Sequence, residues 1–120
     1  MKNLYQNIPK DLPTELFETL IKTDNIHIER IVSKGHTSPK EGWHDQDKNE
    51  FVLLLKGAAR LEFEDGRVVS MGVGDWLEIA AHERHKVVWT GTTYTLRLVC
   101  YLSARLYRKI DAHLMRAAKT

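Results

Sequence analysis

The chain contains almost no cysteine and no long apolar run, and these absences exclude several classes of protein. Cys100 is the only cysteine among 120 residues, which excludes an internal disulfide and a cysteine-rich zinc cluster. Its apolar neighbours indicate a small core residue. No apolar stretch approaches the roughly 18 to 20 residues that a membrane-spanning helix needs, so we expect no membrane partner. Residues 1–13 have neither an apolar h-region nor a small-residue cleavage site, which predicts a cytoplasmic protein.

The remaining composition is typical of one globular domain. Hydrophobic residues make up 42% and charged residues 28% of the chain, and its length suffices for one core but not for two ordinary domains. The formal net charge of +2 is unevenly spread, since residues 104–120 carry five Lys or Arg against Asp111, or +4. The formal net charge of the other residues is therefore 2 minus 4, or −2. The basic character belongs to the C-terminal segment.

Near the N-terminus, a short helix is predicted over residues 13–22 and is expected to pack across the body of the protein. Pro13 suits the first turn of a helix, and acidic residues come early in the segment. An apolar stripe at helical spacing is formed by Leu16, Phe17, Leu20 and Ile21.

From Asn25 onward the pattern indicates strands. Ile26, Ile28 and Ile31 begin a β-rich stretch. Residues 34–49 are rich in turn-forming residues and indicate a loop, with a short strand over 43–46 as an alternative. Short apolar segments then follow at even spacing: FVLLLKG, AARLEFEDG, RVVSMGVGDWLEIA, HKVVWTG and TTYTLRLVCYL. Because no helix of about 10 to 15 residues separates them, an all-β antiparallel sandwich or barrel is favoured over a parallel sheet.

Beyond Leu102 the pattern predicts an amphipathic basic helix over residues 104–120, with a frayed tail as the alternative. Ser103 is a suitable N-cap. Clustered Lys and Arg attract phosphates, but five basic residues on one surface helix are ordinary. Apart from Tyr107, the segment also lacks the aromatic residues of an interfacial membrane helix. We therefore expect a packing or subunit-contact helix rather than a nucleic-acid site. The apolar stripe consists of Leu106, Ile110, Leu114 and Ala117.

Three polar residues precede the first of the even-spaced strands. If residues 44–46 are extended, His44 and Gln46 project from the same face, and Glu50 returns beside them after a turn. An imidazole nitrogen, an amide oxygen and a carboxylate are ligands that a divalent ion accepts. The alternative is that His44 is a solvated loop residue and that Gln46 and Glu50 bond the hairpin backbone.

His85 is the candidate for a fourth ligand. It precedes an alternating strand whose Val87 and Trp89 share its face, and we expect Trp89 to point inward. His85 then faces the same cavity as Glu50. The alternative is a core histidine bonded to a neighbouring carboxylate. The residues predicted to line the ligand pocket are His82, Trp89, Val52 and Leu54, with a turn role for His82 and a packing role for Trp89 as alternatives.

These two stretches resemble the two motifs of the cupin family. His44 to Gly57 is similar to the first motif, G-x5-H-x-H-x3 or 4-E-x6-G, and Gly74 to Trp89 is similar to the second, with His85 at the ligand position. The resemblance covers roughly residues 26–102. The departures are Ser38 for the first Gly, Gln46 for the second His, Ala80 for Pro, His82 for the middle Gly and Trp89 for Asn.

The resemblance implies a small cupin, a jelly-roll barrel over residues 1–103, with a metal site of His44, Gln46, Glu50 and His85. The metal would be Zn, Fe, Ni, Co or Mn, which this donor set does not distinguish. A homodimer is expected by analogy. The leading hypothesis is an enzyme that acts on a small oxygen-bearing molecule by oxygenation, isomerisation or lyase chemistry. Glu50 is the predicted catalytic residue, serving as general base if it does not bind the metal. The alternatives are a non-catalytic binding or sensor module and a degenerate cupin with an empty site.

Overall fold

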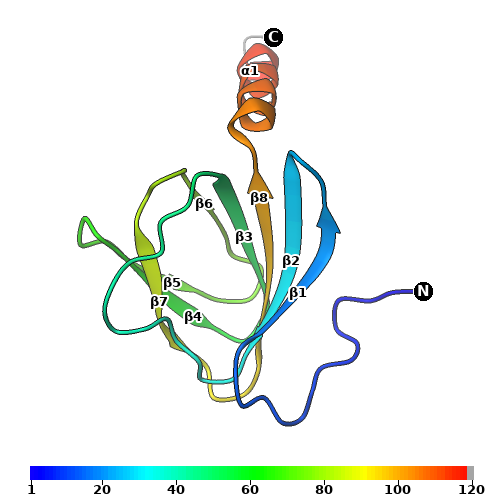
Figure 1. Ribbon diagram of the computed structural model, residues 1–120, viewed down its shortest axis with the longest axis vertical. Coiled ribbons are helices and arrows are strands. Elements are labelled where there is room, and N and C mark those ends of the chain that lie inside the picture. The colour runs from blue at the N-terminus through cyan, green and yellow to red at the C-terminus, as the bar shows by residue number, and fades with distance from the viewer. Residues whose placement is uncertain (119–120) are drawn as a thin grey trace.

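Two antiparallel β-sheets face each other and form a barrel in the computed structural model, which describes residues 1–118 (Figure 1). The larger sheet has the strand order β1-β2-β8-β3-β6, and the smaller sheet has the order β5-β4-β7. This arrangement confirms the all-β jelly-roll barrel predicted from the sequence. The strands are β1 Leu16–Lys22, β2 Ile26–Ser33, β3 Asn49–Lys56, β4 Ala59–Phe63, β5 Val68–Met71, β6 Trp76–Ile79, β7 His85–Thr90 and β8 Thr95–Leu102.

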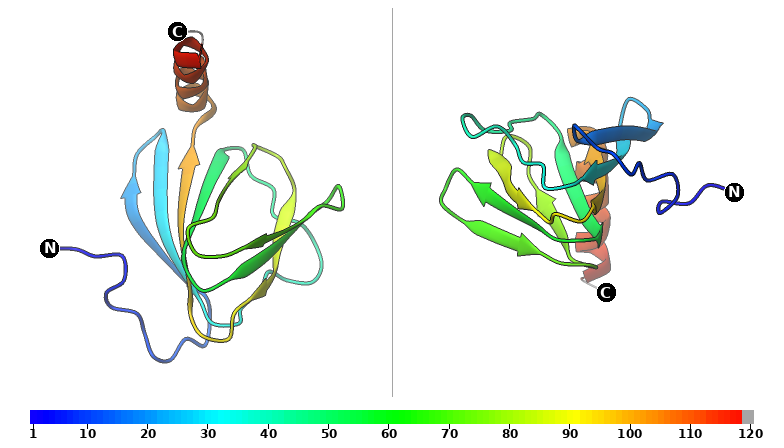
Figure 2. Two further views of the ribbon diagram at one scale, coloured as in Figure 1. Left: turned by 180° about the vertical axis from the view of Figure 1, so that it is seen from behind. Right: turned by 90° about the horizontal axis from the view of Figure 1, so that it is seen from below.

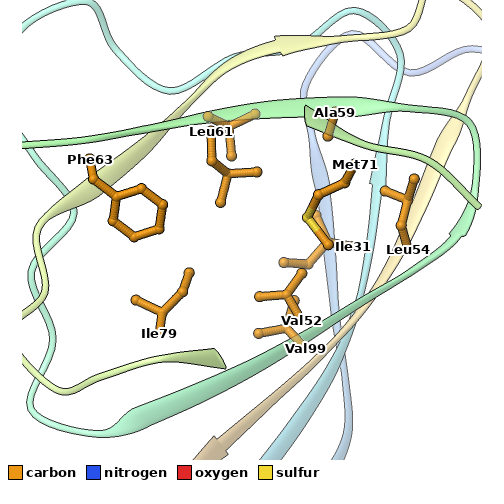
Figure 3. Close-up of a cluster of buried hydrophobic side chains, with 10 residues drawn as sticks. Ile31, Val52, Leu54, Ala59, Leu61, Phe63, Met71, Ile79 and Val99 are labelled. Atoms are coloured by element: carbon orange, nitrogen blue, oxygen red, sulfur yellow. The ribbon is translucent and has the colours of Figure 1, made fainter. Parts of the chain in front are cut away.

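The core fills the space between the two sheets and is built from alternate residues of the surrounding strands (Figure 3). On β3, Val52 and Leu54 point inward and are almost fully buried, whereas Phe51 and Leu53 lie on the outer face and are half-buried. Alternation of this kind follows from the pleat of a strand. The core cluster consists of Ile31, Val52, Leu54, Ala59, Leu61, Phe63, Met71, Ile79, Val87 and Val99.

The helix predicted over residues 13–22 is wrong, because most of this segment forms the edge strand β1. It pairs antiparallel with β2, and the register shifts between Thr19 and Ile21, so that Leu20 is an extra residue. A β-bulge of this kind breaks the alternation of a strand, and the apolar residues then fall at a spacing that imitates a helical stripe. A helix this short has little stability alone, whereas β1 gains the hydrogen bonds of the sheet edge.

The only helix in the described chain, α1 (Ala104–Ala118), follows β8 and projects away from the barrel (Figures 1 and 2). Ser103 is its N-cap as predicted, since its Oγ accepts a hydrogen bond from the backbone N–H of Leu106 at 3.2 Å. The segment is thus a helix rather than a frayed tail. The side chains of Leu114 and Ala117, and residues 119–120, lie outside the described part. No helix in that part is long and apolar enough to cross a membrane.

Candidate metal centre

The backbone aligns two distant histidines at the start of β7. His44 forms an isolated antiparallel bridge with His85. The N–H of His44 donates to the carbonyl of His85 at 2.8 Å, and the N–H of His85 donates to the carbonyl of His44 at 3.2 Å. Residues that exchange both bonds lie directly opposite each other, with their side chains on one face. The strand considered over residues 43–46 is thus reduced to a single bridge, which is enough to pair the two imidazoles.

Glu50, on the inner face of β3, completes a cluster that we call the triad: His44, Glu50 and His85. The ligand atoms of these three residues all lie within 4.8 Å of one another. His85 Nε2 is 3.4 Å from Glu50 Oε2, and the two side chains are only 6% and 8% exposed. The rings of His44 and His85 meet edge to face, with centroids 5.1 Å apart. Three of the four predicted ligands are therefore close together.

Gln46, the fourth predicted ligand, lies between His44 and Glu50. Its Oε1 accepts a hydrogen bond from His44 Nε2 at 2.7 Å, and its Nε2 donates to Glu50 Oε2 at 2.6 Å. Because an amide oxygen can only accept, the ring proton of His44 sits on Nε2 in this arrangement. The amide of Gln46 therefore satisfies two members of the triad by hydrogen bonding, and a metal ion would have to replace those bonds.

The ring of His85 is oriented by the backbone. Its Nδ1 donates to the carbonyl of Glu83 at 2.8 Å, so its Nε2 is the nitrogen that faces Glu50. Metal-binding imidazoles are commonly oriented in this way. Burial pushes the pKa of His85 down, but its hydrogen bonds with the Glu50 carboxylate and the Glu83 carbonyl outweigh burial, and the pKa is raised overall. His85 therefore holds its second proton more tightly than a free imidazole does.

The triad and Gln46 form a donor set that suits a divalent transition metal. Imidazole nitrogens with a carboxylate oxygen are common ligands of catalytic zinc and related ions. With metal–ligand bonds of about 2.1 Å, adjacent donors in a tetrahedral site lie about 3.4 Å apart. His85 Nε2 and Glu50 Oε2 already have this separation. No two ligand atoms of the triad are more than 4.8 Å apart. A modest movement of the side chains is therefore enough to bring these atoms to the separations of a tetrahedral site.

Trp89, predicted to point inward, lies on the outer surface instead. Its side chain is 43% exposed and lies against the guanidinium of Arg60. The register of β7 against β4 shifts between Val87 and Trp89, which leaves Val88 as an extra residue. This bulge reverses the alternation of the strand, and Thr90 is buried in the place expected for Trp89.

His82, predicted to line the pocket, braces the outside of the loop that carries His44 and Gln46. It has a φ of 63°, in the left-handed region that favours glycine. This agrees with its position in the second motif, where the family pattern has a glycine. Its Nδ1 lies 2.8 Å from Asp45 Oδ1, and its side chain is 68% exposed. Hydrogen bonds from His82 and Arg84 lower the pKa of the Asp45 carboxyl.

Val52 and Leu54 follow Glu50 on the inner face of β3. They are 1% and 0% exposed and belong to the closed core. Another core residue, Phe63, has its ring centroid 5.9 Å from that of His85. The core therefore forms an apolar floor under the triad, and the two predicted pocket residues are part of that floor.

Three further polar residues share the inner face of the barrel and were missed in the sequence. His27 and Glu29 alternate with outward residues of β2 and share the face of the core residue Ile31. Tyr101 shares the face of Val99 on β8. Burial, reinforced by the carboxylates of Glu50 and Glu29, raises the pKa of Tyr101, so its hydroxyl keeps its proton. The alternation of IHIERI and LVCYL was the available signal.

A pocket of about 430 Å³ lies between α1 and the larger sheet, and Glu50 is among the residues that line it. Tyr107 and Ile110 line it from α1, and Phe51 and Cys100 line it from the sheet. Cys100, predicted to be a core residue, is thus half-buried on the outer face. Glu78 lies at the same pocket and accepts a hydrogen bond from the Tyr107 hydroxyl at 3.4 Å.

The chain matches a known protein family. The family model of the Cupin domain matches residues 29–102, which include β3 to β8, most of β2 and all four predicted ligands. α1 lies outside the matched range. A search of curated proteins finds no match.

Solved structures also resemble the chain. A protein of Ralstonia eutropha JMP134, assigned provisionally as a mannose-6-phosphate isomerase, is 36% identical with a TM-score of 0.82, and the match covers 87% of this chain and 98% of that one. A cupin superfamily protein of Desulfitobacterium hafniense DCB-2 is 20% identical with a TM-score of 0.68, covering 80% and 84%. The DMSP lyase of Ruegeria pomeroyi DSS-3 is 18% identical with a TM-score of 0.65, covering 75% and 47%. The last two likenesses concern the fold alone.

Proposed function

The chain belongs to the cupin family, and we propose that it holds a divalent transition metal in its barrel and there acts on a small oxygen-bearing metabolite. One observation carries the proposal: the donor atoms of His44, Glu50 and His85 lie within 4.8 Å of one another. Gln46 is the fourth proposed ligand, because it already contacts two members of the triad.

The ligands have separate roles in this proposal. His44 and His85 each offer an imidazole nitrogen, and the Glu50 carboxylate offsets part of the charge of the ion. A bound metal supplies a Lewis acid that polarises a carbonyl, or a redox centre, at positions that the protein leaves open. Two nitrogen and two oxygen donors do not select among Zn, Fe, Ni, Co and Mn, so availability decides which ion is bound.

Glu50 has a second proposed role, as general base, if it does not bind the ion. Its carboxylate is almost fully buried beside His85, and a carboxylate held in a fixed position is a common general base in enzymes. The reaction classes we propose are oxygenation, isomerisation and lyase chemistry. The provisional isomerase among the similar structures, which is 36% identical to this chain, supports isomerisation by analogy.

The amide of Gln46 favours one alternative function. Because it bonds both His44 and Glu50, the cluster is already largely satisfied as a hydrogen-bonded network. A non-catalytic cupin that binds a small ligand, or a degenerate one kept for interaction, would use the cluster in this form.

Metal analysis of protein purified without added metal, followed by titration with Zn²⁺, distinguishes these functions. We expect uptake of about one equivalent per chain by the wild type and loss of tight uptake in His85→Ala. His113→Ala is the matched control, because His113 is an exposed histidine on α1. Less than about a tenth of an equivalent, with no uptake on titration, would reject the metal site and favour the alternative.

We also propose that two copies pair through the outer face of the larger sheet. Phe51 and Trp76 stack there with centroids 5.4 Å apart, and Trp76 is 62% exposed. Exposed aromatic patches are typical of protein–protein contacts. A cytoplasmic location remains a prediction, and nucleic acid is not a proposed partner.

A further inference from the structure

A row of polar side chains crosses three neighbouring strands on the inner face of the larger sheet. Tyr101 on β8 pairs with Glu50 on β3 on one side and with His27 on β2 on the other. Side chains of residues directly opposite in neighbouring strands lie about 5 Å apart on the same face. Tyr101 therefore stands next to the triad, and His27 stands next to Tyr101.

The row is extended and held by local contacts. The ring of His27 lies 5.7 Å from the ring of Tyr101, centroid to centroid, and its Nε2 is 3.0 Å from Thr19 Oγ1. Its Nδ1 is 3.9 Å from Glu29 Oε1, and the two side chains are only 21% and 13% exposed. We call His27, Glu29 and Tyr101 the polar wall.

The polar wall has hydrogen-bonding capacity that the described chain does not use. Neither the Tyr101 hydroxyl nor the Glu29 carboxylate has a hydrogen-bond partner among residues 1–118. Of the completely buried side-chain nitrogen and oxygen atoms in this part, only Arg97 Nε lacks a partner. The Tyr101 hydroxyl and the Glu29 carboxylate are therefore not completely buried, and each keeps some surface that a hydrogen-bonding partner can contact.

We propose that the polar wall is the substrate-binding surface of the candidate metal centre. Tyr101 donates a hydrogen bond to an oxygen of the molecule held at the triad, and Glu29 accepts one from a hydroxyl group of the same molecule. In this role Tyr101 and Glu29 position the substrate and take no part in bond breaking. The inference rests on the proposed function, because it needs a molecule held at the metal.

The charge of the wall indicates the class of substrate. Glu29 and Glu50 both face the site, and Arg97 is the one arginine on the inner face of β2, β3 and β8 in the described chain. Its guanidinium is bound to Glu15 at 3.1 Å, and it pairs with Leu54 in the core. Two carboxylates without a free guanidinium disfavour a phosphate group. We therefore infer a neutral compound with hydroxyl and carbonyl groups rather than a phosphorylated one.

Binding of acetohydroxamate to the Co²⁺-loaded protein, followed by visible absorption, tests the wall. This small probe presents a carbonyl and a hydroxyl oxygen to a metal. Loss of one hydrogen bond in Tyr101→Phe should weaken binding about three- to tenfold, with Co²⁺ content unchanged. Tyr107→Phe is the matched control, since that hydroxyl lies outside the barrel on α1, and it should bind as the wild type does.

The outcomes separate this inference from the proposed function. Equal affinity in Tyr101→Phe and wild type, or a Co²⁺-loaded wild type that binds no acetohydroxamate, would overturn the polar wall while leaving the metal site in place. Protein that takes up no Co²⁺ would overturn the proposed function itself. Inorganic phosphate should compete poorly with the probe in the wild type and better in Glu29→Gln. Strong competition by phosphate in the wild type would overturn the neutral substrate class.

Discussion

The Nε2 of His85 and the Oε2 of Glu50 lie 3.4 Å apart inside the barrel, and each side chain is less than a tenth exposed. A buried carboxylate is costly unless a positive charge or hydrogen-bond donors accompany it. A proton on His85 and a metal ion between the two groups each supply that charge. The two cations compete for one position, so pH controls which of them is bound.

Metal affinity should therefore fall as the pH is lowered. Because the pKa of His85 is raised above its ordinary value of 6.5, its proton stabilises the metal-free fold below that value, and this contribution is lost as the pH rises through the raised pKa. Below the raised pKa, each pH unit should weaken Zn²⁺ binding about tenfold, since one proton must leave. Zn²⁺ titrations between about pH 5 and 8 check this. A flat profile would mean that His85 is not a ligand.

Gly57, the last residue of the first motif, should not tolerate a side chain. Its φ is +85°, and an added Cβ would lie 2.5 Å from Thr95 Oγ1 and 2.9 Å from Thr95 Cα. We expect Gly57→Ala to lower the free energy of unfolding by ~2–4 kcal/mol. Gly66→Ala, with φ +97° and nothing within 4 Å, isolates the backbone strain and should cost ~1–2 kcal/mol. Urea denaturation measures both, and equal losses would show that the contact with Thr95 is unimportant.

Leu54 should behave as a core residue. Its side chain is completely buried, so Leu54→Ala should lower the free energy of unfolding by ~2–5 kcal/mol through lost burial and a new cavity. Val68→Ala, at a site that is 58% exposed, should change it by less than ~0.5 kcal/mol. Thermal and urea unfolding of the two variants gives the comparison. A near-neutral Leu54→Ala would place this residue in an open pocket instead.

Trp76 should control self-association. Trp76→Glu places a charge on the outer face of the larger sheet and is expected to convert the proposed dimer into a monomer. Trp89→Glu changes another exposed tryptophan, on the smaller sheet, and should leave the dimer intact. Light scattering coupled to gel filtration measures the mass in each case. A monomeric wild type, or a dimeric Trp76→Glu, would contradict the proposed interface.

The barrel could be predicted because its signals are local. These signals are apolar runs of strand length, glycines at the turns and two motifs at a fixed spacing. They remain recognisable although several motif residues are replaced. Two of the errors have one cause. The helix expected over residues 13–22 and the inward orientation of Trp89 both depended on strict periodicity, and a bulge interrupts it in β1 and in β7. The position of a bulge depends on how the strand pairs with its neighbour, and the residue pattern of one segment does not show that pairing.

The candidate site was predictable only in part, for a related reason. The motif spacing identified His44, Glu50 and His85, which lie together. His27, Glu29 and Tyr101 were missed, although alternation places each of them on the same face of its strand as a core residue. Alternation did not reveal that β8 lies between β2 and β3, and this strand order is what brings Tyr101 beside Glu50. Pairing between distant strands therefore decides which polar residues meet.

Anomalous diffraction from crystals of the Zn²⁺-loaded protein tests the metal centre most directly. The account predicts one strong peak at about 2.0–2.2 Å from a nitrogen of His44, a nitrogen of His85 and an oxygen of Glu50, with Gln46 turned from its present hydrogen bonds. Data that show no peak there at saturating Zn²⁺, with Gln46 still bridging His44 and Glu50, would contradict it.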